Sequence, residues 1–361
     1  MNARAQGRRR RAVNREERQA ASLAQRPFKQ VTYRYKPQEI LSADQVEAIH
    51  RTALQILKEV GFKVLSDRAR EAYASVGFDT DDASQLVRFD PEGVEALVAK
   101  APAEFELAAR NQAHNIRFGG PHAVFTGVGG PAYVSDLDKG RRAGTYDEVC
   151  DFMRLIQSLN IMHQEGGGGF EALDLPAETR HLDLFYACCT LTDKNWQPWG
   201  MGRAQAMDAM NMAAISHQVS LEELCDLPVF ACIINTNSPL QLDIPMAEGL
   251  MTMAEHGQCA VVTPFTLSGA MSPVTLAGAL AQQHAEALAG MALTQIVRPG
   301  APTMYGGFTS NVDMKTGSPA FGTPEYAQAA QASGQLARHV GVPFRSSNVT
   351  SANANDAQAA Y

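Results

Sequence analysis

The stretch "CAVVTPFTLSG" (Cys259 to Gly269) decides the fold class, because it reads as an apolar strand that leads into a long helix. Its first residues are apolar and largely β-branched, without a polar residue at every second position, as in strands buried on both faces. A short loop follows, and then a helical pattern that runs from Pro273 to Ile296. A strand, a loop and a helix in this order form the unit of a parallel sheet, so we expect an α/β fold.

The same unit recurs from about residue 145 to the last residue. We count about six βα units in these roughly 200 residues, whereas a (β/α)₈ barrel has eight in about 250. The sequence therefore predicts a TIM-like (β/α)₈ barrel, incomplete here, over residues 145–361. An open doubly wound sheet is the alternative, but neither G-x-G-x-x-G nor G-K-[ST] follows any strand. The helical patterns cover residues 147–159, 179–192, 204–217, 244–256 and 324–340.

A smaller region precedes the predicted barrel, at residues 37–144. Ser42 and Gln45 form a capping box that opens a helix ending near Gly61. Ser66 and the pair Asp90-Pro91 begin two further helices. Short alternating runs between residues 105 and 137, separated by Gly and Pro, predict antiparallel strands. Residues 37–144 should therefore form an N-terminal helical and β region.

Charge is concentrated at the start of the chain. Residues 1–35 hold ten Arg and Lys against two Glu, while the whole chain has a net charge of −7. This segment lacks apolar periodicity, so we expect residues 1–36 to be a disordered basic arm. The acidic remainder argues against a nucleic-acid partner.

The composition is that of an ordinary soluble globular protein, with 45% hydrophobic and 19% charged residues. No apolar run is long enough to span a bilayer, and no secretory signal opens the chain. The six cysteines lack C-x-x-C spacing, which indicates buried thiols rather than disulfides or a zinc site. We expect a cytoplasmic protein that does not bind a membrane.

The carboxyl ends of the strands are where a parallel barrel places its active site. Both tryptophans, Trp196 and Trp199, fall in one strand-end segment, and Tyr305 and Phe308 fall in another. Converging aromatic faces attract a quaternary ammonium ion through the ring quadrupole. The alternative is that these rings plug the mouth or pack against the helical region. The strand-end candidates are His163, Gln164, Glu165, Trp196, Trp199, Asn235, Asn237, Thr266, Ser268, Tyr305, Phe308, Thr309, Ser310, Arg345, Ser346, Ser347 and Asn348.

A metal site is not expected. His163 and Glu165 share one face of a strand, but the sequence indicates no third ligand and contains no H-x-x-x-H pair. No G-x-S-x-G nucleophile motif occurs either. The four glycines at residues 166–169 could let a substrate or a large cofactor approach the backbone, or could simply form a flexible loop.

Long runs of this sequence resemble the trimethylamine methyltransferase family. They are "ILSADQVEAIHRTALQILKEVGFKV" (Ile40 to Val64), "LSGAMSPVTLAGALAQQHAEALAGMALTQIVRPGAP" (Leu267 to Pro302), "MYGGFTSNVDMKTGSPAFGTPE" (Met304 to Glu325) and "GVPFRSSNVTSANANDAQAAY" (Gly341 to Tyr361). The resemblance covers nearly everything after Pro37. It implies a TIM-like barrel that moves a methyl group from an amine to the cobalt of a separate corrinoid protein. Family chains are longer than this one by roughly two barrel units.

One position departs from the family pattern. Members that demethylate trimethylamine carry pyrrolysine between the G-[LV]-P strand and the D-x-Q-A helix, and Val349 stands at that position here. Valine has no electrophilic imine, so trimethylamine activity is not expected. The resemblance instead implies an enzyme for glycine betaine or a related betaine, whose nitrogen is already cationic and leaves as a neutral tertiary amine.

In this interpretation Trp196, Trp199, Tyr305 and Phe308 are candidates for the cage around the ammonium group. Arg345 and His163 are candidates to bind the betaine carboxylate. Arg345 could instead form a structural ion pair with Asp313 or Glu325. Asn348 and Val349 would line the space that pyrrolysine fills elsewhere.

Two other functions stay open at this stage. A quaternary-amine binding or regulatory protein would keep the pocket without turnover, and a zinc-dependent barrel methyltransferase would need clustered Cys and His ligands. An incomplete barrel would also expose two sheet edges, which predicts a homo-oligomer or poor solubility.

Overall fold

A parallel sheet lies at the centre of the molecule. The computed structural model describes residues 24–347. Strand β12 is central, because it pairs in parallel with β10 on one side and with β13 and then β14 on the other, while β15 pairs with β13. The α/β fold with a parallel sheet is thereby confirmed. The five strands are β10 (Ala231–Thr236), β12 (Cys259–Ser268), β13 (Thr303–Gly306), β14 (Phe308–Asn311) and β15 (Phe344–Arg345).

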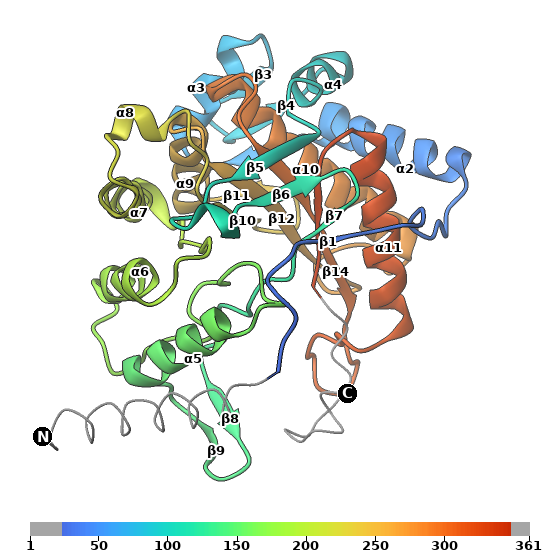
Figure 1. Cartoon of the computed structure of the whole chain (residues 1–361). Helices are drawn as coiled ribbons and strands as arrows, with labels where there is room; N and C mark the ends of the chain where they lie inside the picture. Colours follow the sequence, from blue (N-terminus) through green and yellow to red (C-terminus); the bar gives the residue numbers. More distant parts are fainter. Residues whose placement is uncertain (1–23, 348–361) are drawn as a thin grey trace, which may run out of the picture.

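Helices cover one face of this sheet. The side chains of Ile234, Val262 and Tyr305 belong to the same core as these helices. Helix α10 is the most deeply buried, with nearly every residue from Ala279 to Gln295 shielded from solvent. Figure 1 shows α7, α8 and α9 on one flank and α2 and α11 on the other. These helices are α7 (Gly202–His217), α8 (Leu221–Leu224), α9 (Ile244–Glu255), α10 (Leu276–Val297) and α11 (Pro324–His339).

A β-hairpin covers the amino-terminal part of the other face. Strands β5 (Glu104–Leu107) and β6 (Ile116–Gly119) pair in antiparallel fashion. Leu107 and Ile116 form a second, smaller core with the sheet residues Val261 and Met304. Successive side chains of a strand point to opposite faces. Because both faces are covered, the β12 sequence is apolar without alternation.

The sheet is prolonged by extended segments that pair only at single residues. Gln164 forms parallel bridges with Thr126 and with Asn195, and the Asn195 side-chain amide donates to the carbonyl of Val229. These segments follow α5 (Tyr146–Ser158) and α6 (Arg180–Leu191), as the βα pattern predicts.

Glycine permits this close approach of backbone segments. A Cβ atom on Gly166 would lie 1.8 Å from the carbonyl oxygen of Gly127, and one on Gly129 would lie 2.0 Å from the carbonyl oxygen of Gly166. Any larger residue at these positions would push the two segments apart. The glycines at residues 166–169 therefore belong to a tightly packed segment rather than to an open loop.

The N-terminal helical region packs onto the same core. The capping box of Ser42 and Gln45 is confirmed, as are the caps at Ser66 and Asp90. Tyr73 is fully buried and donates a hydrogen bond to the carbonyl of Ala289 on α10. The elements are α2 (Ala43–Gln55), the π-helix Ile56–Val60, β2 (Phe62–Val64), α3 (Asp67–Ser75), β3 (Asp79–Asp81), β4 (Leu86–Arg88) and α4 (Pro91–Val98).

A second sheet joins the two regions, in the order β11-β2-β4-β3. Strand β11 (Gln241–Leu242) comes from the loop after β10 and pairs in parallel with β2. The hairpin of β8 (Val134–Asp136) and β9 (Gly140–Arg142) includes one strand that the sequence pattern did not predict.

Part of the predicted basic arm lies against the body. β1 (Val31–Thr32) pairs with β7 (His122–Ala123), and the side chain of Gln25 donates to the carbonyl of Ser158. The rest of the predicted arm, residues 1–23, lies outside the described residues.

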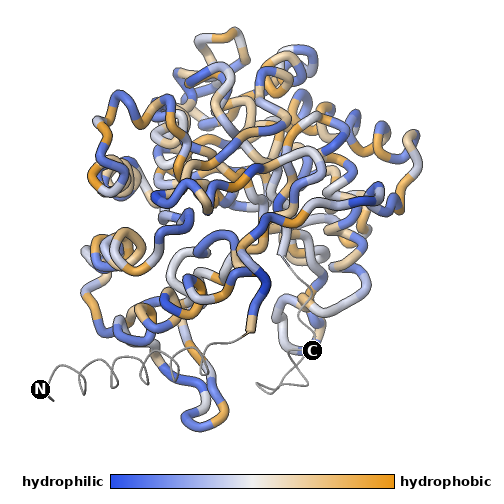
Figure 2. Tube along the Cα trace, in the orientation of Figure 1, coloured by the Kyte–Doolittle hydropathy of each residue, from blue (hydrophilic) through white to orange (hydrophobic). Residues whose placement is uncertain are grey.

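Burial is one-sided on the peripheral helices. Figure 2 shows hydrophilic and hydrophobic residues interleaved along α2 and α7, as expected for helices with one face on the core. Among residues 24–347, no helix has the length and apolar character that crossing a bilayer requires.

Candidate functional site

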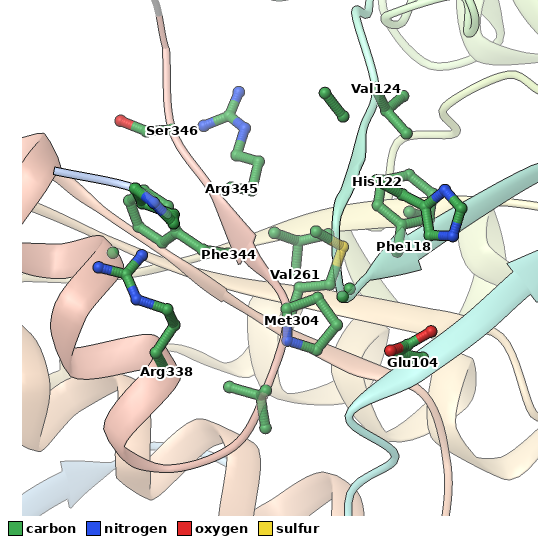
Figure 3. A pocket seen from close by; sticks show the side chains of 18 of the residues that line it. Glu104, Phe118, His122, Val124, Val261, Met304, Arg338, Phe344, Arg345 and Ser346 are labelled. Atoms are coloured by element: carbon green, nitrogen blue, oxygen red, sulfur yellow. The ribbon is translucent and has the colours of Figure 1, made fainter. Parts of the chain in front are cut away.

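A cavity of about 830 Å³ opens beside the sheet, between β15 and the segment around β7. Figure 3 shows Arg338, Phe344, Arg345 and Ser346 on one side of it and the residues around β6 and β7 on the other. Val261 and Met304 lie between the two walls. The cavity thus extends from the edge strand β15 across the face of the sheet to the segment around β7.

The strand register orders the cavity-facing side of the sheet into layers. Val261 pairs with Ile233 and with Met304, and all three side chains line the cavity. This layer is apolar and packs on the β5–β6 hairpin.

Two residues further along each strand, the same face carries polar groups. Thr263 pairs with Asn235, and Gly306 pairs with Arg345. Gly306 lies level with Thr263, because a Cβ atom on this glycine would approach Thr263 Oγ1 to 2.0 Å. The polar layer therefore holds one cation, Arg345, and lies nearer the carboxyl ends of the strands than the apolar layer.

Arg345 has no carboxylate partner among residues 24–347. Neither Asp313 nor Glu325 pairs with it; Asp313 instead accepts from Thr316 and from the backbone of its own turn. Burial lowers the pKa of the Arg345 guanidinium, and the nearby Tyr326 acts in the opposite direction. An arginine keeps its charge even so, because its usual pKa lies far above neutrality. Within the described part of the chain, the site therefore presents a positive charge without a carboxylate counter-ion.

Gln164 also faces this cavity. Its side chain is 4% exposed, and its amide nitrogen has no hydrogen-bond partner among the described residues. Leaving a buried donor unpaired costs about 1–3 kcal/mol, so a ligand acceptor would be favoured here. Gln164 and Arg345 thus offer donors from two separate strands.

A cluster of four aromatic rings occupies the next layer. Phe308 pairs with Phe265 across β14 and β12, and their rings stack with centroids 5.0 Å apart. Phe321 meets Phe308 edge-on at 5.1 Å, and Tyr326 lies 5.8 Å from Phe308. Phe265, Phe308 and Phe321 are half-buried, while Tyr326 is buried with an unpaired hydroxyl group. We call Phe265, Phe308, Phe321 and Tyr326 the aromatic cluster.

The other predicted rings lie elsewhere. Trp196 is 2% exposed and packs between Phe185 and Phe230 in the helix-facing core. Tyr305 is fully buried on the helix side, where its hydroxyl oxygen accepts a hydrogen bond from Gln283 and lies 3.1 Å from His284 Nδ1. Among the described residues no ring contact joins any two of Trp196, Trp199, Tyr305 and Phe308, so a cage of these four is not assembled.

Trp199 takes a separate position. A Cβ atom on Gly167 would lie 3.5 Å from the indole nitrogen of Trp199, which places this ring beside the glycine segment. Tyr146 and Phe170 line the same small pocket as Trp199. Trp199 is therefore near the strand ends but outside the large cavity.

His163 is occupied by the N-terminal segment. Its Nδ1 accepts from the backbone N–H of Phe125, and its Nε2 lies 3.3 Å from the carbonyl oxygen of Lys29. Burial lowers the pKa of His163, which favours a neutral ring that donates from Nε2. The side chain is fully buried, so both ring nitrogens are engaged away from the cavity.

The carboxylate of Glu165 binds the backbone of the glycine segment at residues 166–169. It is fully buried and accepts hydrogen bonds from the backbone N–H groups of Gly167 and Gly168. Burial raises the pKa of this carboxyl group. The contacts of Glu165 therefore stabilise the glycine segment. The predicted residues Asn348 and Val349 lie outside the described residues. Among residues 24–347, no three His, Cys, Asp or Glu side chains are grouped to hold a metal ion.

Phe265, Phe321 and Tyr326 are the residues that sequence reasoning missed. Phe265 lies four residues after Val261, so strand alternation alone places both on one face. Phe321 and Tyr326 lie in and beyond a loop, and only the folded chain brings them to Phe308.

Comparison with known proteins gives one consistent result. A sequence model described as trimethylamine methyltransferase matches residues 4–361. A glycine betaine methyltransferase of Desulfitobacterium hafniense is 36% identical over 89% of this chain and 67% of its own length. A proline betaine:corrinoid methyltransferase of Eubacterium limosum is 24% identical over 84% of this chain and 64% of its own length.

The fold agrees with a solved structure. The crystal structure of the monomethylamine methyltransferase of Methanosarcina barkeri matches with a TM-score of 0.55 at 10% identity, covering 85% of this chain and 62% of the other. The chain thus spans about two thirds of the length of these proteins.

Proposed function

Because the chain belongs to the trimethylamine methyltransferase family, we propose that it moves a methyl group from glycine betaine or a related betaine to the cobalt of a corrinoid on a partner protein. The observation that carries the proposal is Arg345, which lines the cavity without a carboxylate partner among residues 24–347, on a sheet that also carries the aromatic cluster on β12 and β14. A cationic head and a carboxylate are the two groups that such a site complements.

The chemistry requires little of the protein beyond binding. The C–N bond breaks with its electron pair on nitrogen, and the methyl group joins cobalt(I), which supplies the pair for the new bond. A quaternary nitrogen departs as a neutral tertiary amine, so no covalent activation of the amine is needed, and no pyrrolysine is required. The protein's task is to orient one N-methyl group toward the mouth and to exclude water.

The predicted substrate-binding residues take different parts in this proposal. Phe308 and Arg345 contact the substrate, and Asn348, which lies outside the described residues, stays a prediction from the family resemblance. Trp199 and Trp196 stabilise the strand ends, Tyr305 anchors β13 to α10, and His163 fixes the N-terminal segment. No cofactor is assigned to the chain itself, since the corrinoid belongs to the partner.

We also propose that the whole protein closes a TIM-like barrel. About six βα units would lie in residues 145–361, with the helical and β region at 37–144. Support comes from β15 and the Val124–Thr126 segment, which both line the cavity, with β15 paired only to β13. Further parallel strands would pair with both edges.

The test is loss of cob(I)alamin absorbance under anaerobic conditions. Reduced cobalamin is mixed with the protein and with glycine betaine, proline betaine, choline or trimethylamine. We expect loss with one betaine and none with trimethylamine. Loss with trimethylamine alone would contradict the proposal.

The alternative is a betaine-binding or regulatory protein without turnover. The Gln164 amide, which has no partner among the described residues, and the cavity-lining Arg345 favour ligand binding whether or not methyl transfer follows. Binding of a betaine, measured by calorimetry, without methyl transfer to either cobalamin or a corrinoid protein would favour this alternative.

A further inference from the structure

We infer that the layers of the sheet hold a short zwitterion upright, with its carboxylate at Arg345 and its ammonium group at Phe265 and Phe308, nearest the mouth. This inference rests on the proposed function and adds to it the orientation and length of the substrate. It also assigns to Phe265 a binding role that the sequence did not suggest.

The order of the layers follows from register. Along β12, Val261 lines the cavity, and strand alternation places Thr263 and Phe265 on the same side of the sheet, each two residues after the last. Their partners are Met304 for Val261 and Phe308 for Phe265. From the amino to the carboxyl ends of the strands, the wall is therefore apolar, then polar, then aromatic.

The polar layer is the only one of the three with a cation. Arg345 enters it from β15, opposite Gly306, which has no side chain to occupy the space. The unpaired amide of Gln164 faces the same cavity from another strand. Each group is a donor suited to an acceptor with negative charge, and a carboxylate has the geometry that a guanidinium binds with two parallel hydrogen bonds.

The aromatic layer lies two residues further, which is about 6.6 Å along a strand. A ligand that reaches both layers therefore carries its two charges about one such spacing apart. This favours a betaine whose carboxylate is one or two carbons from nitrogen over a long-chain one.

The orientation has a consequence for the reaction. With its carboxylate in the inner layer, the substrate directs its N-methyl groups to the carboxyl ends of the strands, the side from which an external acceptor approaches a barrel. Trimethylamine and choline lack the anchoring carboxylate.

Calorimetric binding of three ligands to the full chain tests the layers separately. Glycine betaine has both groups, choline has only the ammonium group, and tert-butylacetate has the carboxylate with an uncharged head of the same shape. We expect wild-type protein to bind glycine betaine most tightly and the other two more weakly.

Two variants should then give a crossed pattern, in which each variant weakens a different pair of the three ligands. Arg345→Gln should weaken glycine betaine and tert-butylacetate about tenfold or more and change choline by less than about twofold. Phe308→Leu should weaken glycine betaine and choline about three- to tenfold and leave tert-butylacetate within about twofold. Phe265→Leu should behave as Phe308→Leu does.

Matched controls come from the same molecule. Arg338→Gln removes a cavity arginine that lies on α11 rather than in the polar layer, and Phe105→Leu removes a ring from the β5–β6 hairpin. Both should change all three affinities by less than about twofold. Circular dichroism checks that every variant is folded.

The inference is overturned if each variant weakens all three ligands equally, or if Arg338→Gln acts as Arg345→Gln does. The experiments distinguish a failure of this inference from a failure of the proposed function. A crossed pattern without methyl transfer would support the layered site and contradict the proposed reaction. Methyl transfer without a crossed pattern would support the reaction and contradict the layered site.

Discussion

Single buried polar residues of α10 hold the strand ends in place. Glu286 is fully buried and accepts hydrogen bonds from Thr236, Ser238, the backbone N–H of Leu240 and Gln282. Burial raises the pKa of this carboxyl group, while the four donors act in the opposite direction. One side chain therefore organises the whole loop after β10.

Replacing Glu286 by leucine should lower the free energy of unfolding by about 3 kcal/mol, because the Leu240 N–H and the hydroxyl groups of Thr236 and Ser238 would lose their acceptor. Glu286→Gln is the matched control. It keeps an acceptor oxygen for Leu240, so it should cost at least about 1 kcal/mol less. Urea unfolding followed by circular dichroism measures both, and equal losses would contradict this account.

At the scale of elements, a chain of side chains links the N-terminal helices to the sheet. His50 on α2 lies 2.9 Å from His284 on α10, and His284 lies 3.1 Å from the hydroxyl of Tyr305 on β13. On its outer side His50 meets Glu95 of α4 at 3.0 Å, and its ring packs against that of His339 on α11. Four helices and a strand thus meet at this chain.

Stability should fall on acidification because of His284. Burial, and then the charges of His50 and His339, hold the pKa of His284 well below its usual value of 6.5. The folded state keeps this ring neutral, while the unfolded chain takes up a proton below about pH 6.5, so acid favours unfolding. The effect reaches about 1.4 kcal/mol per pH unit for one proton.

His284→Gln should therefore lose less stability than wild type between pH 7 and 5, by about 2 kcal/mol. Tyr305→Phe is the control, since it removes a partner of His284 but keeps the buried ring, and it should retain the wild-type pH dependence. Denaturant unfolding at a series of pH values gives the slopes. Parallel slopes for His284→Gln and wild type would contradict the assignment.

At the scale of the whole molecule, the N-terminal region and the sheet share one core. A continuous set of buried side chains runs from Val46 in α2 to Val342 before β15, and it includes Tyr73 and Trp196. Strand β11, from the loop after β10, also pairs with β2 from the N-terminal region. The two regions are therefore expected to unfold together.

Tyr73→Ala should test this cooperativity, because the substitution lies in the N-terminal region and both tryptophans lie in the sheet region. We expect a loss of about 3–5 kcal/mol that appears equally in tryptophan fluorescence and in far-ultraviolet circular dichroism. Tyr35→Ala, at a side chain that is 87% exposed, should change stability little. Two separate transitions in the variant would mean that the regions are independent.

Helices and caps were predictable because their signals are local. The capping boxes, the proline starts and the apolar spacing act within a few residues, so α2 to α4 and α9 to α11 lie close to their predicted bounds. The segments around Gln164 and Asn195 were predicted as strands, but they pair only at single residues. Glycine contacts such as Gly166 with Gly127 shape them, and such contacts depend on distant chain segments.

The sequence by itself determined the α/β class, the helices and the family, because periodicity, capping and long shared runs are properties of neighbouring residues. The tertiary structure alone decided which side chains share a site. Trp196 and Tyr305 face the helices, whereas Phe308 joins Phe265, Phe321 and Tyr326. The face on which a strand residue lies depends on the register and on what covers each face, and both are set by contacts between residues far apart in the chain.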